Sequence, residues 1–139
     1  MSATHLRRAL GVVLVALVFC SFSLHQDAKA RVTIHNACRV YYPAVLKCQQ
    51  TFKKIGVVTS RTIFDATPEY KQIARRKLSP NTAEWCFLAK AASDKFRTAV
   101  DKTVKGGGYD LIAENGAITV EGHTSYDVTS EVLAHLPAE

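Results

Sequence analysis

The sequence predicts an α+β fold in which a small antiparallel β body carries a short helical hairpin. Three observations lead to this prediction. Short β-rich runs stand on both sides of the chain centre, two helix-patterned segments follow one another directly, and an Asn-Gly pair joins two apolar runs. The chain has 139 residues, of which 47% are hydrophobic and 22% charged, and this composition is that of a single small globular domain.

The first thirty residues have the pattern of a secretory signal peptide. Arg7-Arg8 precedes an apolar run over 9–20, and Ala28-Lys29-Ala30 ends the segment with the small-x-small pattern of a cleavage site. The apolar run is shorter than the roughly 20 residues that a membrane-spanning helix needs. We therefore expect a cleaved signal over 1–30 and a periplasmic mature chain that starts at Arg31, with an uncleaved anchor as the alternative.

The chain is basic, with 18 Lys and Arg against 12 Asp and Glu, and it stays basic when the signal is removed. A basic cytosolic protein would suggest nucleic acid as a partner, but an exported protein rarely meets it, so we expect no nucleic-acid partner. The positive charge instead favours an anionic membrane surface or acidic stretches of other exported proteins. A basic surface that serves solubility alone is the alternative.

Residues 31–54 form an N-terminal extension. The run Arg31–Ile34 is β-rich and predicts a short strand. Pro43 then suits the first position of a helix. Three residues would share one face of that helix: Val45, Cys48 and Phe52.

The segment 55–78 predicts a buried strand followed by a helix. The strand is the apolar run Ile55–Val58. Thr67 as N-cap, Pro68 in the first turn and Glu69 near the positive helix end give a well-specified start signal. The apolar face of this helix consists of Tyr70, Ile73, Ala74 and Leu78. Ser79-Pro80 ends the helix, because the residue before a proline disfavours helical backbone.

A second helix follows at once, over Asn81–Lys105, with Asn81 and Glu84 resembling an N-cap and its return partner. Apolar residues alternate at spacings of four and three along it, as in the seam of a helical hairpin. The seam consists of Trp85, Ala89, Ala92, Phe96, Ala99 and Thr103, and Leu88, Val100 and Val104 widen it. The short connection predicts antiparallel packing on the face Tyr70–Ile73–Ala74. Gly106–Gly108 stops the helix.

Two β-rich runs and a last helix complete the chain. Tyr109–Ala113 and Ala117–Val120 flank Glu114-Asn115-Gly116, and an Asn-Gly turn between such runs predicts a β-hairpin. Asp127 is expected to cap the last helix. The apolar stripe of that helix consists of Val128, Val132, Leu133 and Leu136, before Pro137.

Three cysteines remain after signal cleavage. In an oxidising compartment, this number predicts one disulfide and one free thiol. We expect the disulfide between Cys38 and Cys48, since Pro43 favours a turn between them, and a buried thiol at Cys86. The competing pairing joins Cys86 to Cys38 or Cys48.

The sequence contains no constellation that predicts catalysis. His35, His123 and His135 lack a His or Cys partner at metal-ligand spacing, and there is no Cys-x-x-Cys pair. The glycines after Lys105 are not a phosphate loop, because no Gly-Lys-Ser/Thr follows them. We therefore expect a protein that is not an enzyme and needs no cofactor and no metal.

Two passages together resemble the Skp/OmpH family of periplasmic chaperones. IGVVTSRTIFDATPEYKQIARRKL resembles the opening of that family, where a strand leads through a Ser/Thr-Pro-Glu turn into a helix. The passage from FRTAVDKTVK through GGGYDLIAENGAITVEGHTSYDVTSEVLAHL resembles its close, which ends in a pattern of the form aspartate-x-Thr-x-x-Val-Leu. The two passages cover roughly residues 55–78 and 96–136, so residues 55–139 would be a Skp/OmpH-like domain.

This resemblance implies a homotrimer whose helical hairpins hold unfolded outer-membrane proteins between them. Here the arms are strongly shortened: the expected helices span about 16 Å and about 37 Å at ~1.5 Å per residue. The extension 31–54 also has no counterpart in the family. Two function classes therefore remain, a chaperone-like binder of unfolded exported polypeptides and a non-enzymatic trimeric structural or adaptor protein. Four residues are candidates for the helix seam or for client contact: Trp85, Leu88, Ala92 and Phe96.

Overall fold

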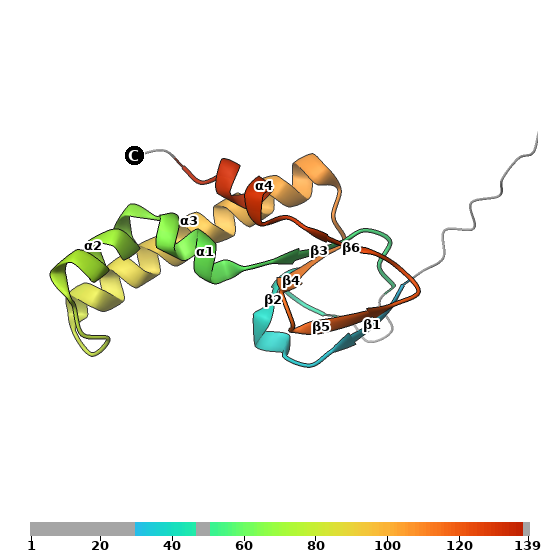
Figure 1. Cartoon of the computed structure of the whole chain (residues 1–139), viewed down its shortest axis with the longest axis horizontal. Helices are drawn as coiled ribbons and strands as arrows, with labels where there is room; N and C mark the ends of the chain where they lie inside the picture. The colour runs from blue at the N-terminus through green and yellow to red at the C-terminus, as the bar shows by residue number, and fades with distance from the viewer. Residues whose placement is uncertain (1–29, 47–50, 138–139) are drawn as a thin grey trace, which may run out of the picture.

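The computed structural model describes residues 30–46 and 51–137, and it has the mixed α+β architecture that the sequence predicts. Helices form one end of the molecule and strands the other (Figure 1). The strands of the described chain are β1 (Arg31–Ile34), β2 (Val40–Tyr42), β3 (Ile55–Val58), β4 (Leu111–Glu114), β5 (Ile118–Glu121) and β6 (Ser125–Asp127). The helices are α1 (Ser60–Ala66), α2 (Pro68–Arg76), α3 (Ala83–Gly107) and α4 (Thr129–Ala134), with a 3₁₀ turn η1 (Ala37–Arg39).

The β body is mixed and not purely antiparallel. One sheet has the order β2-β4-β3-β6, and a second sheet pairs β1 with β5. Strand β3 runs parallel to both of its neighbours, with Ile55 opposite Leu111 of β4 and Ser125 of β6. The prediction of an antiparallel body is thus wrong for β3. The reason is that the helical segment between β3 and β4 is a crossover connection, which brings the chain back in the same direction.

The Asn-Gly turn forms, but the predicted hairpin does not. The amide of Ala117 donates to the carbonyl of Glu114 at 2.9 Å, and Gly116 has a φ of 81°, which favours glycine. However, β4 pairs with β2 and β3, whereas β5 pairs with β1 in the other sheet. Both edges of β4 are occupied by β2 and β3. The turn therefore connects strands of two different sheets instead of two strands that pair with each other.

The N-terminal extension contributes strands to both sheets. Strand β1 lies where the sequence predicts it. The helix predicted after Pro43 is absent from the described residues of the extension, and the residues before it, Val40–Tyr42, pair with β4 as strand β2. Phe52 is buried instead of lying on a helix, and its carbonyl accepts a hydrogen bond from the amide of Ala30.

The last residue of the predicted signal peptide is part of the folded core. Ala30 is only 4% exposed and belongs to the apolar cluster under β1 and β5. The rest of the predicted signal, residues 1–29, lies outside the described residues, as does Cys48.

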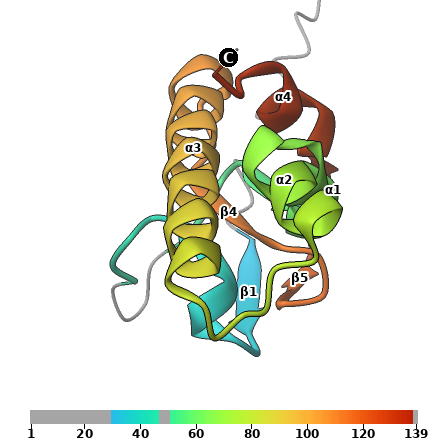
Figure 2. The ribbon, with the colours of Figure 1, turned by 90° about the vertical axis from the view of Figure 1, so that its left-hand side faces the viewer.

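Helix α2 starts where the sequence predicts it, and a further helix, α1, precedes it. The hydroxyl of Thr67 accepts a hydrogen bond from the amide of Tyr70, and Pro68 opens the helix. The helix ends at Arg76, before the expected Leu78, because Lys77 adopts the left-handed conformation with a φ of 52°. Figure 2 shows α1 and α2 beside α3.

Helix α3 starts two residues later than expected. Its N-cap is Thr82 and not Asn81, since the Thr82 hydroxyl accepts from the amide of Trp85. Glu84 does not return to the cap but forms a salt bridge with Arg76 of α2. The helix has 25 residues, ends at the predicted glycines and is capped by Gly108.

The last helix has the predicted stripe, and an unpredicted strand precedes it. Val128 and Val132 are fully buried, while Leu133 packs against the same cluster. The N-cap of α4 is Val128 and not the predicted Asp127, although the side chain of Asp127 accepts a hydrogen bond from the amide of Thr129, the first residue of the helix. The carbonyl of Val57 accepts from the amide of Val128, which holds this start against β3.

Candidate functional site

The predicted helix seam is for the most part core. Leu88, Ala92 and Phe96 are 8%, 0% and 3% exposed, so they are not available for client contact. Trp85, near the start of α3, is only half-buried. Of the four candidate residues, only Trp85 therefore has side-chain surface to offer a partner.

The predicted packing of α3 on α2 is confirmed, whereas the ring contacts of Phe96 are with residues outside α2. The Phe96 ring contacts Phe64 of α1 at 5.2 Å between centroids and Tyr41 of β2 at 4.8 Å. Phe64 in turn contacts Tyr70 of α2, while Ala74, which was expected on the buried face, is exposed. Helix α1 thus supplies the aromatic contact between α3 and the first half of the hairpin. This helix was not predicted, and its N-cap Thr59 makes no side-chain cap hydrogen bond.

A charged contact ties the two helices of the hairpin together. The Nζ atom of Lys95 lies 2.7 Å from Oε1 of Glu69, and the two side chains are 26% and 14% exposed. The second carboxylate oxygen of Glu69 is buried and has no hydrogen-bond partner in the described chain. Glu69 therefore has a structural role on the inner face of the hairpin, beyond its predicted place near the helix start.

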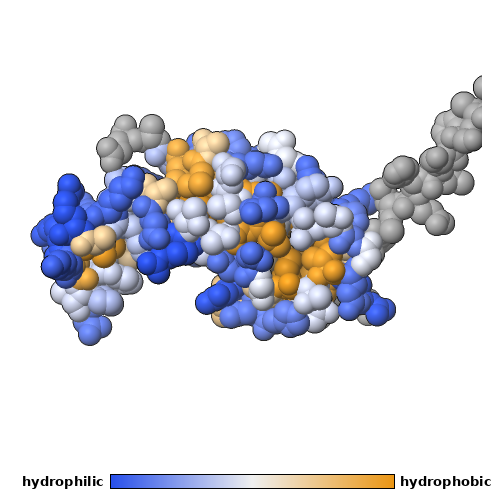
Figure 3. Space-filling view, viewed as in Figure 1, coloured by the Kyte–Doolittle hydropathy of each residue, from blue (hydrophilic) through white to orange (hydrophobic). Residues whose placement is uncertain are grey.

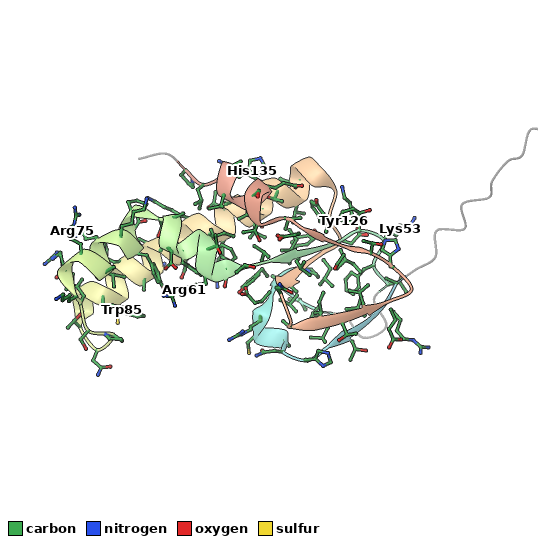
Figure 4. The ribbon with its side chains drawn as sticks, in the orientation of Figure 1. Lys53, Arg61, Arg75, Trp85, Tyr126 and His135 are labelled. Carbon is green, nitrogen blue, oxygen red and sulfur yellow. The ribbon has the colours of Figure 1, made fainter. Side chains whose placement is uncertain are left out.

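The hairpin tip comprises residues 75–87, that is the end of α2, the connecting loop and the first turns of α3. Phe87 is 73% exposed there, and Trp85 and Leu78 are half-buried. Figure 4 places Arg75 and Trp85 at the same end of the hairpin. Figure 3 shows strongly hydrophilic side chains over this end, with a small hydrophobic area among them.

Basic side chains gather at the end of α2 and in the residue that follows it. All of those within the hairpin tip are exposed: Arg75, Arg76 and Lys77. Within the described residues, only Arg76 of this group has an ion-pair partner, Glu84. The tip therefore combines an exposed aromatic ring with unpaired positive charge, and aromatic and arginine side chains are the ones enriched at binding interfaces.

A cavity of about 460 Å³ opens between α3 and the segment 38–44 of the extension. Its apolar lining consists of Val40, Tyr41, Ala44, Phe64, Phe96 and Val100. Its polar lining consists of Cys38, Ser93, Arg97 and Asp101. This volume is in the range of small-ligand sites, and the mixture of an apolar wall with few polar groups is typical of them.

One carboxylate fixes the wall of this cavity. Glu114 of β4 accepts a hydrogen bond from the hydroxyl of Tyr41 at 2.9 Å and from the amide of Ser60 at 3.1 Å. Burial, together with the hydrogen bond to Glu114, raises the pKa of Tyr41 above that of free tyrosine. The Tyr41 ring is thereby held edge-on to Phe96, at an interplanar angle of 86°.

The cysteines are placed differently from the prediction. Cys86 is exposed and not buried, because it lies on the outer side of the first turn of α3. Cys38 is an exposed free thiol in this structure, and its predicted partner Cys48 lies outside the described residues. The disulfide between Cys38 and Cys48 therefore stays a prediction.

Within 30–46 and 51–137, no group of three or more His, Cys, Asp or Glu side chains could hold a metal ion. Over the same ranges, no helix is both long and apolar enough to cross a membrane.

Comparison with family models, with curated proteins and with solved structures finds no match to this chain. The hairpin tip and the cavity lined by Tyr41, Phe64 and Phe96 are therefore described from this structure alone. Sequence reasoning missed three of the residues that define them: Phe87, Tyr41 and Arg97. Phe87 could have been found from the sequence, because it is a large aromatic residue of the predicted helix that is not part of the predicted seam.

Proposed function

We propose that the protein is a periplasmic, chaperone-like binder of unfolded exported or outer-membrane polypeptides, and that it binds them at the hairpin tip. The observation that carries this proposal is that the hairpin tip, residues 75–87, holds both the exposed ring of Phe87 and the exposed basic side chains of Arg75, Arg76 and Lys77. Unfolded chains expose the apolar side chains that folding buries, and such side chains gain from contact with an exposed aromatic ring. The positive charge adds attraction for acidic stretches of a client and for an anionic membrane surface.

The order of elements supports the relation to the Skp/OmpH family that the sequence suggests. A strand, a short helix, a helical hairpin, three strands and a final helix occur in that order over β3 to α4, and a turn joins the first two of these three strands. The hairpin itself is short, since α2 has 9 residues and spans about 14 Å at ~1.5 Å per residue. Such arms do not enclose a client, so binding here takes place on a surface.

The proposal includes a homotrimer, which is the assembly that the family resemblance implies. Strand β6 is an edge of the four-stranded sheet, and its three residues are exposed. Edge strands present unpaired backbone groups that another chain can cover. Light scattering of the protein at tens of micromolar should give the mass of three chains, and the mass of one chain would contradict this part of the proposal.

The alternative is a trimeric structural or adaptor protein without holding activity. The burial of Leu88, Ala92 and Phe96 favours it, because most of the predicted contact stripe is used up in the core. The two functions share the same assembly and differ in whether unfolded clients bind.

An aggregation assay separates them. A urea-unfolded outer-membrane protein is diluted into buffer that contains the protein, purified from the periplasm, at three chains per client. We expect light scattering from the client to fall, and we expect Phe87→Ser to remove at least half of this protection.

The matched control is Val45→Ser. Val45 is also 73% exposed but lies in the N-terminal extension, away from the tip. It should leave the protection unchanged. No protection by the unmodified protein, with the trimer intact, would favour the adaptor, and equal loss in both variants would contradict a site at the tip.

A further inference from the structure

The aromatic cavity beneath α3 has a chemistry of its own. Three rings, those of Tyr41, Phe64 and Phe96, share one side of it. Phe96 contacts both of the other rings, at 4.8 and 5.2 Å between centroids. A ligand ring that enters the cavity meets further ring edges and faces, and this is the surrounding that aromatic groups prefer.

The polar side of the cavity carries one positive and one negative group. Arg97 and Asp101 lie one turn apart on α3, so they occupy the same face of the helix. Both side chains are exposed, and neither has an ion-pair or hydrogen-bond partner among the residues that the structure describes. The guanidinium group is a donor without acceptors, and the carboxylate is an acceptor without donors.

This pair complements the two halves of a peptide group. The guanidinium of Arg97 can donate to a main-chain carbonyl, and the carboxylate of Asp101 can accept from a main-chain N–H. Because the two charges are opposite, the rim selects neither a purely anionic nor a purely cationic ligand. The same rim beside an apolar pocket suits an aromatic side chain that is still part of a polypeptide.

The geometry points to a site that takes one aromatic side chain of an extended polypeptide, with the ring among Tyr41, Phe64 and Phe96 and the main chain on Arg97 and Asp101. This inference rests on the proposed function, since it names the feature of an unfolded client that is read. It assigns a second contact, separate from the hairpin tip. The exposed thiol of Cys38 lines the entrance and is no part of the recognition.

The test uses short peptides as probes and the amide signals of the isotope-labelled protein as readout. We expect acetyl-Gly-Ser-Phe-Ser-Gly-amide to shift the signals of Ser93, Arg97 and Asp101 in a saturable way. The same peptide with Ala in place of Phe should cause no saturable shift. Free phenylalanine, which has a ring but no peptide group on either side, should bind at least threefold more weakly.

Two helix variants give a matched pair. Ser93 lines the cavity, and its hydroxyl donates to the carbonyl of Ala89. Thr98 is exposed elsewhere on α3, and its hydroxyl donates in the same way to the carbonyl of Asp94. Ser93→Leu should fill the cavity and abolish the shifts, while Thr98→Leu should keep them. Arg97→Gln should weaken peptide binding about threefold or more without affecting the fold.

Several results would overturn the inference. Equal shifts from the Phe and Ala peptides would show that the cavity does not bind the aromatic side chain. Binding of free phenylalanine as tight as that of the peptide would make the cavity a small-molecule site. Retained shifts in Ser93→Leu would place the contact elsewhere. Whether the tip binds clients is tested separately, by the aggregation assay of Phe87→Ser. In that variant, the peptide-induced shifts at the cavity should persist.

Discussion

The ring of Tyr109 occupies the space that a side chain at Gly107 would need. A Cβ atom at position 107 would lie 2.3 Å from Cε2 of Tyr109. Tyr109 is 5% exposed, and its hydroxyl donates to Glu131 at 3.1 Å. The Nζ atom of Lys54 lies over the same ring and donates to the carbonyl of Gly107 at 2.6 Å. The end of α3 and the start of β4 are thus joined at this glycine.

Gly107→Ala should destabilise the protein by about 1–3 kcal/mol, because the buried ring of Tyr109 has to move. The control is Gly106→Ala, one residue earlier, where a Cβ atom would meet nothing within 4 Å. That change should be neutral or stabilise by up to about 1 kcal/mol, since alanine is the better helix former. Urea unfolding followed by circular dichroism measures both. Equal effects in the two variants would contradict the close contact.

Lys95→Met should lower the free energy of unfolding by about 1–3 kcal/mol. It leaves the carboxylate of Glu69, which is 14% exposed, without its charged partner. Lys90→Met is the comparison, because the pair of Lys90 and Asp94 is solvent-exposed on the same helix. Its loss should cost under about 1 kcal/mol. Identical urea midpoints for the two variants would show that the pair of Lys95 and Glu69 stabilises the fold no more than the solvent-exposed pair does.

The loss of stability at acid pH should depend on Asp127. Hydrogen bonds from the hydroxyl and the amide of Thr129 lower the pKa of the Asp127 carboxyl below its usual range. Since the carboxylate is favoured in the folded state, this contribution is present above about pH 4 and is lost as the pH falls through the lowered pKa. Asp127→Asn should therefore flatten the decline of stability below about pH 4. An unchanged decline in urea midpoints between pH 6 and pH 2.5 would argue against this.

The cysteines should separate by their reactivity. In the unreduced exported protein, we expect Cys86 to react with a thiol reagent without denaturant, because it is exposed. Peptide mapping should find Cys38 linked to Cys48. A linked peptide that contains Cys86 would overturn this pairing, and three reactive thiols would speak against an oxidising compartment.

Local signals in the sequence predicted the elements that depend on neighbouring residues. Thr67 and Pro68 specify the start of α2 through a cap and a fixed φ, and both act as predicted. The apolar run Ile55–Val58 is a buried strand because it has no polar face to offer solvent. The Asn-Gly turn also forms, as its conformational preference requires.

Strand partners could not be predicted in the same way, because they depend on residues far apart in the chain. Val40–Tyr42 lies where the sequence predicts a turn around Pro43, yet it pairs as a strand with β4, more than sixty residues later. That pairing also places Tyr41 on Phe96 and forms the cavity. The inner face of α3, by contrast, follows from helical spacing, and the buried residues Ala92, Phe96 and Ala99 all belong to the predicted seam.

Photo-crosslinking at the hairpin tip tests the central claim most directly. Phe87→p-benzoylphenylalanine keeps an aromatic ring at the tip, and Ser130→p-benzoylphenylalanine places the same group at an exposed position of α4, outside both the tip and the cavity lining. On irradiation with an unfolded outer-membrane polypeptide, position 87 should give a crosslinked product and position 130 should not. Crosslinks of equal yield at both positions, or none at position 87, would contradict polypeptide binding at the tip.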